Sequence, residues 1–206
     1  MLIGVIGNFM APEPKLLDAP PRTFRDAVVL PFGEFFQRAG VGKGFAVLLF
    51  IVLYKLSDSL AQNMATPFLL KTGFSQTDIG AISGGLGLGA TIIGALAGGA
   101  IAGRIGINRS LWVFGGLQAV SNLMYYLLAV IGKSYAFLVA TMIVENFCTG
   151  LVTAGFLAFL MSMCSVRFSA TQFALLSSLM AASRDIIIAP AGGIAAAVGW
   201  PTFFII

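Results

Sequence analysis

The stretch of sequence that decides the fold is YAFLVATMIVENFCTGLVTAGFLAFLMSM, residues 135–163, in which Glu145 is the only charged residue. A transmembrane α-helix needs about 20 consecutive, predominantly apolar residues, and this run is longer than that. The rest of the chain has the same character, since 58% of its 206 residues are hydrophobic and 10% are charged. A soluble domain carries about 25% charged residues. The sequence therefore predicts an all-α integral membrane protein.

Similar apolar runs lie on both sides of this stretch, separated by loops of only a few residues. Helices joined by such short loops must be antiparallel neighbours. Two of the runs begin with a capping-box pattern, Ser75-x-x-Asp78 and Ser169-x-x-Gln172. We expect five full spans and the start of a sixth at Trp200; the five lie at 44–70, 77–103, 110–131, 135–163 and 171–198.

The first 43 residues differ from the remainder. Residues 1–10 are apolar but too short to span a bilayer, so we expect the tail of a preceding helix. Residues 11–43 form a polar linker with most of the charges, and residues 23–37 alternate charged and bulky apolar side chains. That pattern predicts an amphipathic helix on the membrane surface, broken near Pro31. With both ends truncated in this way, we expect a fragment of a longer protein.

The basic residues indicate the orientation and argue against a nucleic-acid partner. The net charge is +4, but the basic residues are spread over short loops and form no patch. Cytoplasmic loops of membrane proteins carry an excess of Lys and Arg, so the side with more of them is inside. The linker is predicted to be cytoplasmic because its side holds Lys15, Arg22, Arg25, Arg38, Lys43, Arg104, Arg109 and Arg167, whereas the other side holds Lys71 and Lys133.

Glycines recur at every fourth position along span two. Small residues at this spacing let two helix backbones approach closely. Both a static packing surface and a surface along which helices slide during transport fit the pattern. The four pairs are Gly80/Gly84, Gly85/Gly89, Gly94/Gly98 and Gly99/Gly103.

Ionisable side chains at membrane depth are costly unless they are paired or face water, so each one marks a candidate functional site. Residues three or four positions apart share a helix face, and four spans each present one polar face. We expect these faces to line a common cavity. They comprise Lys55, Asp58 and Gln62 on span one; Gln118, Ser121, Asn122 and Tyr125 on span three; Glu145, Asn146 and Thr149 on span four; and Arg184 and Asp185 on span five.

Two interpretations of the charged residues stay open. Lys55 and Asp58 can neutralise each other as a purely structural ion pair. Glu145 has no basic partner on its own helix, so it must meet a cation from another helix, bind a cationic part of a substrate, or hold a proton. Because a proton-coupled carrier needs a carboxyl group that takes up and releases a proton, Asp58 and Glu145 are the candidates for proton coupling.

Enzymatic chemistry has little support in the sequence. The chain has no histidine, so neither a Ser-His-Asp triad nor a histidine metal site can form. The glycine-rich run at 84–89 lies inside a predicted span and follows no strand, so it is not a nucleotide-binding loop. We expect no enzyme activity, no cofactor and no metal.

The loop after span two resembles the signature G-x-x-x-D-R-x-G-R-R of the major facilitator superfamily. Here it reads GAIAGRIGINR at 99–109, with glycine in place of the acidic residue and Ile107-Asn108 in place of the basic pair. In that family the second-half copy is commonly degenerate, which favours a C-terminal six-helix bundle with truncated ends. The resemblance implies a role in conformational change for Gly99, Gly103, Arg104, Gly106 and Arg109.

A closer resemblance, to the AmpG muropeptide permeases, covers nearly the whole chain. It is carried by APEP at 11–14, LYKLSD at 53–58, PFL at 67–69, GFS at 73–75, EN at 145–146, ATQFALLSS at 170–178 and GWPTFF at 199–204. It implies a twelve-helix core of two bundles with the substrate site between them near the midplane, in a bacterial inner membrane. Residues 11–43 would connect the bundles, and the N-terminal bundle would be the partner of this one in a protein that is monomeric when complete.

The implied activity is proton-driven import of GlcNAc-anhydroMurNAc peptides from periplasm to cytoplasm, for cell-wall recycling and, through it, β-lactamase induction. The implied partners are the muropeptide, protons and membrane lipids. Two alternatives stay open: a carrier of another substrate, such as acetyl-CoA or a sugar, and a membrane scaffold or sensor that does not transport. For a muropeptide, Gln62, Gln118, Asn122, Tyr125 and Asn146 would hydrogen-bond sugars and amides, and Lys55 and Arg184 would meet peptide carboxylates.

Overall fold

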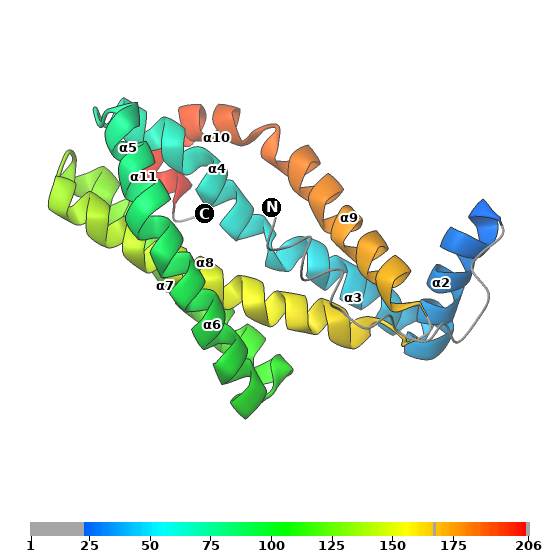
Figure 1. Ribbon diagram of the computed structural model, residues 1–206. Helices are drawn as coiled ribbons and strands as arrows, with labels where there is room; N and C mark the ends of the chain where they lie inside the picture. The colour runs from blue at the N-terminus through cyan, green and yellow to red at the C-terminus, as the bar shows by residue number, and fades with distance from the viewer. Residues whose placement is uncertain (1–22, 167, 205–206) are drawn as a thin grey trace.

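The computed structural model describes residues 23–166 and 168–204, which form helices joined by short turns and no strand (Figure 1). Four helical segments are long and apolar enough to cross a membrane, and a bent pair of helices makes a fifth if it is counted as one span. They correspond to the five predicted spans, and the all-α membrane class is confirmed. The segments are Val41–Lys71, Gln76–Ile105, Ile107–Ile131, Tyr135–Met163, and the pair Ser169–Ile186 with Ala191–Val198.

Three of these five segments are interrupted. Lys55 separates α3 (Val41–Tyr54) from α4 (Leu56–Lys71). A π-helix, η1 (Ser83–Gly87), joins α5 (Gln76–Ile82) to α6 (Leu88–Ile105). Pro190 lies between α9 (Ser169–Ile188) and α10 (Ala191–Val198), and the two axes differ by 43°. Proline removes a backbone donor and clashes with the preceding turn, which accounts for this bend.

Tight turns connect the uninterrupted helices α7 (Ile107–Ile131) and α8 (Tyr135–Met163) to the rest. Gly106 alone separates α6 from α7, with φ at 85°, a conformation that favours glycine because it has no Cβ. Gly106 belongs to the signature loop, and the structure gives it this role in the turn. After α10 the chain enters the short helix α11 (Trp200–Phe203), which packs against α7 (Figure 1).

The closest contact between helices is the crossing of α6 and α8, and glycine makes it possible. A Cβ on Gly94 would lie 2.1 Å from the carbonyl oxygen of Phe147, and a Cβ on Gly150 would lie 2.3 Å from that of Thr91. A Cβ on Gly98 would lie 2.9 Å from Leu151 Cα. The predicted pair Gly94/Gly98 is therefore confirmed as a helix-packing surface.

The other three predicted glycine pairs do not pack in this way. Nothing among the described residues lies within 4 Å of a Cβ built on any of their members, so the predicted close approach is wrong for them within this part of the chain. The regular spacing could not separate the two groups, because all four pairs have the same sequence pattern. The unpacked glycines are Gly80, Gly84, Gly85, Gly89, Gly99 and Gly103.

Apolar side chains form three clusters. The smallest joins α6, α7 and α8 through Ala102, Phe114, Leu151 and Val152, and the two larger ones form layers toward opposite ends of the bundle. The first layer contains Phe68, Leu69, Phe74, Leu128 and Leu138 with their neighbours. The second layer contains Ile51, Leu111, Phe156, Leu160 and Leu176 with theirs.

The polar stretches 55–62 on α3–α4, 118–122 on α7 and 145–149 on α8 lie between these two layers. Gln118 hydrogen-bonds both Asp58 and Glu145, so the three stretches meet at the same depth.

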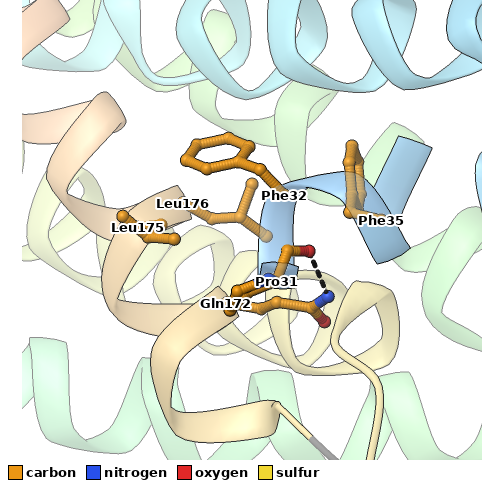
Figure 2. A pocket seen from close by; sticks show the side chains of 6 residues that line it. All are labelled: Pro31, Phe32, Phe35, Gln172, Leu175 and Leu176. Carbon is orange, nitrogen blue, oxygen red and sulfur yellow. Dashed lines mark hydrogen bonds between the residues drawn. The ribbon is translucent and has the colours of Figure 1, made fainter. Parts of the chain in front are cut away.

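The helix α2 (Phe24–Ala39) is present as predicted, but it continues through Pro31 and is not broken there. Pro31 and Phe35 are buried, and Figure 2 shows Pro31 beside α9, where the side-chain amide of Gln172 donates to the Pro31 carbonyl at 2.9 Å. The same amide nitrogen donates to Glu34 at 2.6 Å. This docking holds α2 on the bundle while Pro31 interrupts only the local backbone hydrogen bonding.

Gln172 also explains why one of the two predicted capping boxes is wrong. Its side-chain oxygen accepts from the backbone N–H of Ser165 at 2.6 Å, and α9 has no side-chain cap. The Ser75 box is confirmed at α5, where the Ser75 hydroxyl accepts from the N–H of Asp78 at 3.1 Å. The predicted helix tail at 1–10, the linker up to residue 22, and Arg167 lie outside the described residues.

We expect Gly150→Ala to destabilise the complete protein by about 1–3 kcal/mol, because its Cβ has no room against the backbone of α6. Gly116→Ala is the matched control, since Gly116 lies on α7 with nothing within 4 Å and alanine favours helix by about 1 kcal/mol. Thermal unfolding of the purified protein in detergent measures both effects. Equal melting temperatures for the two variants would contradict the assigned α6–α8 crossing.

Candidate functional site

A polar layer lies between the two apolar layers and joins three helices. Lys55 lies at the α3–α4 junction and Asp58 is on α4, Gln118 is on α7, and Glu145 is on α8. Asp58 is 3% exposed, Gln118 5% and Glu145 2%. These residues are consequently removed from water as well as from lipid, and their partners must come from the protein itself.

Asp58 is the most completely paired of the buried groups. Its Oδ2 lies 2.5 Å from Lys55 Nζ, an ion pair between residues one helical turn apart. Its Oδ1 accepts from Gln62 Nε2 at 2.9 Å and from Gln118 Nε2 at 3.1 Å. Three donors, one of them cationic, therefore surround this carboxyl group.

Glu145 is paired differently, by neutral donors. Its Oε1 accepts from Gln118 Nε2 at 2.9 Å, and its Oε2 lies 2.9 Å from the Ser121 hydroxyl. No ion pair of Glu145 is found among residues 23–166 and 168–204. Lys55, the cation of this layer, is held by Asp58. The layer therefore contains one cation and two carboxyl groups, so an added proton would make it neutral.

Gln118 connects the two carboxyl groups. Its amide nitrogen carries two hydrogens, and the geometry directs one to Asp58 and the other to Glu145. The amide thereby joins α4 to α8 through α7. Its oxygen, Oε1, is buried and has no hydrogen-bond partner in the described part of the chain, which is uncommon for a buried acceptor.

Of the nine predicted coupling and substrate-binding residues, five form one network. They are Lys55, Asp58, Gln62, Gln118 and Glu145. Gln62 is exposed and also donates to Thr149 on α8 at 2.9 Å. Asn122 is buried at the same level of α7 as Gln118. The other three predicted residues, Tyr125, Asn146 and Arg184, lie outside this network.

Tyr125 belongs to an aromatic cluster in the apolar layer. Its ring stacks on Phe204 with centroids 5.2 Å apart and meets Phe68 edge-on at 6.5 Å. It is 2% exposed, so its ring is covered by other side chains of the bundle. The structure does not present this ring for stacking on a sugar.

Asn146 faces α6 and η1 instead of the carboxyl groups. Its Nδ2 donates to the Met142 carbonyl at 2.8 Å, and its Oδ1 accepts from the Thr91 hydroxyl at 3.3 Å. A Cβ on Gly87, the last residue of the π-helix, would lie 3.2 Å from Asn146 Nδ2. The side chain thus packs into the widened turn of the π-helix.

Arg184 and Asp185 on α9 pair with each other away from the polar layer. Both guanidinium contacts to Asp185 Oδ1 measure 3.0 Å, and the side chains are 51% and 68% exposed. An exposed pair of this kind contributes little to stability. The two arginines of the signature loop, Arg104 and Arg109, are also exposed.

Ser121 and Thr149 are functional-site residues that the sequence analysis placed on polar faces but did not assign to the site. Ser121 lies three residues after Gln118, and Thr149 lies four residues after Glu145. This spacing was sufficient to find them, because residues three and four apart share a helix face. Their small hydroxyl groups gave no reason to prefer them over structural serines and threonines.

We expect Gln118→Leu to lower the melting temperature of the complete protein more at high pH than at low pH. The amide stabilises the ionised carboxyl groups, and each hydrogen bond to a charged group is worth about 1.5–3 kcal/mol. In the leucine variant the Asp58 and Glu145 carboxylates repel each other with no amide between them, and protonation at low pH removes this repulsion. Gln62→Leu, at an exposed position with one bond to Asp58, should show a smaller and less pH-dependent loss. Identical losses at both pH values would contradict the bridging role.

The chain was compared with known proteins. No protein-family model matches it. It is 42% identical over 202 residues to an anhydromuropeptide permease of Escherichia coli strain K12, covering 98% of this chain and 40% of that protein. It is 36% identical to an uncharacterized protein of Haemophilus influenzae, covering 99% of this chain and 50% of that protein. A Rickettsia prowazekii protein that carries the name AmpG 1 is 35% identical over 84% of this chain.

The similarity extends over the sequence motifs and over the helices that carry the polar layer. The chain spans about two fifths to one half of the length of these relatives, as a bundle of the major facilitator superfamily would. The resemblance noted from the motifs is confirmed, and the chain is homologous to a segment of the AmpG-type permeases.

Proposed function

We propose that the chain is part of a proton-coupled importer that carries anhydromuropeptides from the periplasm to the cytoplasm. Support for the substrate comes from the 42% identity to an anhydromuropeptide permease over almost the whole chain. The observation that supports proton coupling is Glu145, a buried carboxyl group whose hydrogen bonds within the described part of the chain come from two neutral side chains, Gln118 and Ser121. In this proposal the complete protein serves cell-wall recycling and, through it, β-lactamase induction.

The charges of the polar layer suggest where the proton binds. Asp58 accepts three donors, including Lys55, with which it forms the ion pair of this layer. Glu145 forms no ion pair within residues 23–166 and 168–204, and an unpaired carboxylate is expensive inside a membrane. Glu145 therefore takes the proton, and Asp58 contributes by holding Lys55 and by sharing Gln118.

Substrate contacts are proposed for the polar groups at the accessible edge of the layer. Gln62 is exposed and lies next to the ion pair, where its amide can hydrogen-bond a sugar hydroxyl or a peptide amide. Arg184 is exposed, and its partner Asp185 can be exchanged for a peptide carboxylate without burying a charge. Lys55 is more enclosed, and a substrate carboxylate would have to compete with Asp58 for it.

The proposal places the protein in the bacterial inner membrane with the 11–43 linker on the cytoplasmic side. The excess of basic residues on that side of the bundle supports this orientation. The remaining helices of the complete protein would supply the other half of the substrate site, as in other carriers with repeated bundles.

The decisive experiment uses the complete gene product in cells that lack their own permease. We expect uptake of labelled anhydromuropeptide that collapses with a protonophore and falls at least tenfold in Glu145→Gln, because glutamine keeps the size of the side chain but cannot exchange a proton. Asp78→Asn, in the first turn of α5 and outside the polar layer, is a control for folding and insertion and should retain uptake within a factor of about two.

Each outcome distinguishes the proposal from its alternatives. No uptake by wild-type protein that is folded in the membrane would refute the muropeptide assignment and favour a carrier of acetyl-CoA or a sugar, or a scaffold. Uptake that is insensitive to the protonophore would refute the proton coupling. Full uptake by Glu145→Gln would remove Glu145 from the coupling path.

A further inference from the structure

The Ser121 hydroxyl has two oxygen neighbours, and it cannot make the same hydrogen bonds to them in both protonation states of Glu145. Its hydroxyl oxygen is 2.8 Å from the backbone carbonyl oxygen of Gln118 and 2.9 Å from Glu145 Oε2. Ser121 is 1% exposed, so these contacts are made without bulk water. A hydroxyl group has a single hydrogen, and a carbonyl oxygen can only accept.

The single hydrogen allows two arrangements. When Glu145 is ionised, the Ser121 hydroxyl donates to Glu145 Oε2, and its contact with the Gln118 carbonyl has no hydrogen between the two oxygens. When Glu145 carries a proton on Oε2, that O–H donates to Ser121 Oγ, and the Ser121 hydrogen turns to the Gln118 carbonyl. Both short contacts are then hydrogen bonds.

We propose that Ser121 is a positioning residue whose hydroxyl rotates when Glu145 gains or loses a proton. It donates to Glu145 when Glu145 is ionised and to the backbone of α7 when Glu145 is protonated. The inference deepens the proposed proton coupling and rests on Glu145 as the group that binds the proton. The step is balanced: a hydronium ion gives one proton to Glu145 Oε2 and becomes water, so one O–H bond breaks as another forms, and the Ser121 hydroxyl rotates. Release of the proton to water reverses both changes.

Through Gln118, rotation of the Ser121 hydroxyl affects the hydrogen bonds between neighbouring helices. Its amide nitrogen bonds Glu145 Oε1 and Asp58 Oδ1, and its backbone carbonyl is the second acceptor for Ser121. A proton on Glu145 weakens the amide bond to Glu145, because the acceptor is no longer charged, and adds a bond to the carbonyl. The contact between α7 and α8 therefore changes its pattern of hydrogen bonds with each proton.

The other titratable groups around Glu145 come from the α3–α4 segment, α7 and α8, whereas the described part of α6 that crosses α8 supplies none. They are Lys55 and Asp58 at the α3–α4 junction and on α4, Tyr125 on α7, and Cys148 on α8, while Tyr54 on α3 faces Asp58. Asp58 and Lys55 neutralise each other at 2.5 Å. Tyrosine and cysteine are neutral near pH 7 at their ordinary pKa values. The Cys148 thiol also hydrogen-bonds Ser121, but a thiol is a weak donor and a weak acceptor, and Ser121 is the hydroxyl group that hydrogen-bonds Glu145 itself.

The first test compares Ser121→Ala with Ser110→Ala in the complete permease. Ser110 is a matched control, since it is also buried on α7 and donates to a backbone carbonyl, that of Ile107, at 2.7 Å. We expect Ser121→Ala to move the pH midpoint of uptake by about 1 pH unit toward higher pH, because ionised Glu145 loses a charge-assisted donor. Ser110→Ala should keep the wild-type midpoint. A wild-type midpoint for Ser121→Ala would overturn the inference.

A second measurement is independent of transport. Infrared difference spectra of the purified full-length protein should contain a protonated-carboxyl C=O band that disappears in Glu145→Gln. In Ser121→Ala this band should move to higher frequency, because the acid loses its acceptor, while Ser110→Ala leaves it in place. An unmoved band would overturn the role of Ser121 even if uptake is normal. A moved band in a protein that takes up no muropeptide would instead refute the proposed substrate and retain the role of Ser121.

Discussion

The structure depends on the fact that charged groups inside a membrane bundle must find their partners within the protein. Asp58 and Glu145 lie between two apolar layers, where neither water nor lipid can solvate them. One amide, that of Gln118, serves both. Three helices are therefore fixed relative to one another at mid-depth by polar contacts, and the apolar layers enclose those contacts from both ends.

The two faces of α8 have separate tasks. Phe147, Gly150 and Leu151 meet α6 with almost no space between the backbones, which fixes the rotation of α8 about its axis. Glu145 lies on another face of the same helix and is turned toward α4 and α7. Because the glycine contact leaves α8 no freedom to rotate, the carboxyl group is held against Gln118 and Ser121.

Much of this architecture could be predicted from the sequence. Length and hydropathy located the five spans, and residues three or four apart placed Lys55, Asp58 and Gln62 on one face. The sequence could not show that Gln118 joins Asp58 to Glu145, because that contact depends on how three helices pack. Arg184 was expected in the cavity on the same grounds as Glu145, yet its neighbour Asp185 pairs with it at the surface. The pairing of Gln172 with Pro31, from a segment 141 residues away, is equally invisible to local patterns.

The π-helix at Ser83–Gly87 sets the phase between the two halves of its span. A π-turn holds one residue more than an α-turn, and each residue of an α-helix turns the chain by about 100°. Loss of one residue here would restore the regular repeat and rotate α5 by that angle relative to α6. The glycines of α6 would still face α8. Asp78 of α5, which accepts a hydrogen bond from Tyr135 at 2.8 Å, would turn away from Tyr135. The extra residue thus rotates α5 relative to α6, so that the glycine face of α6 and Asp78 of α5 can both face α8.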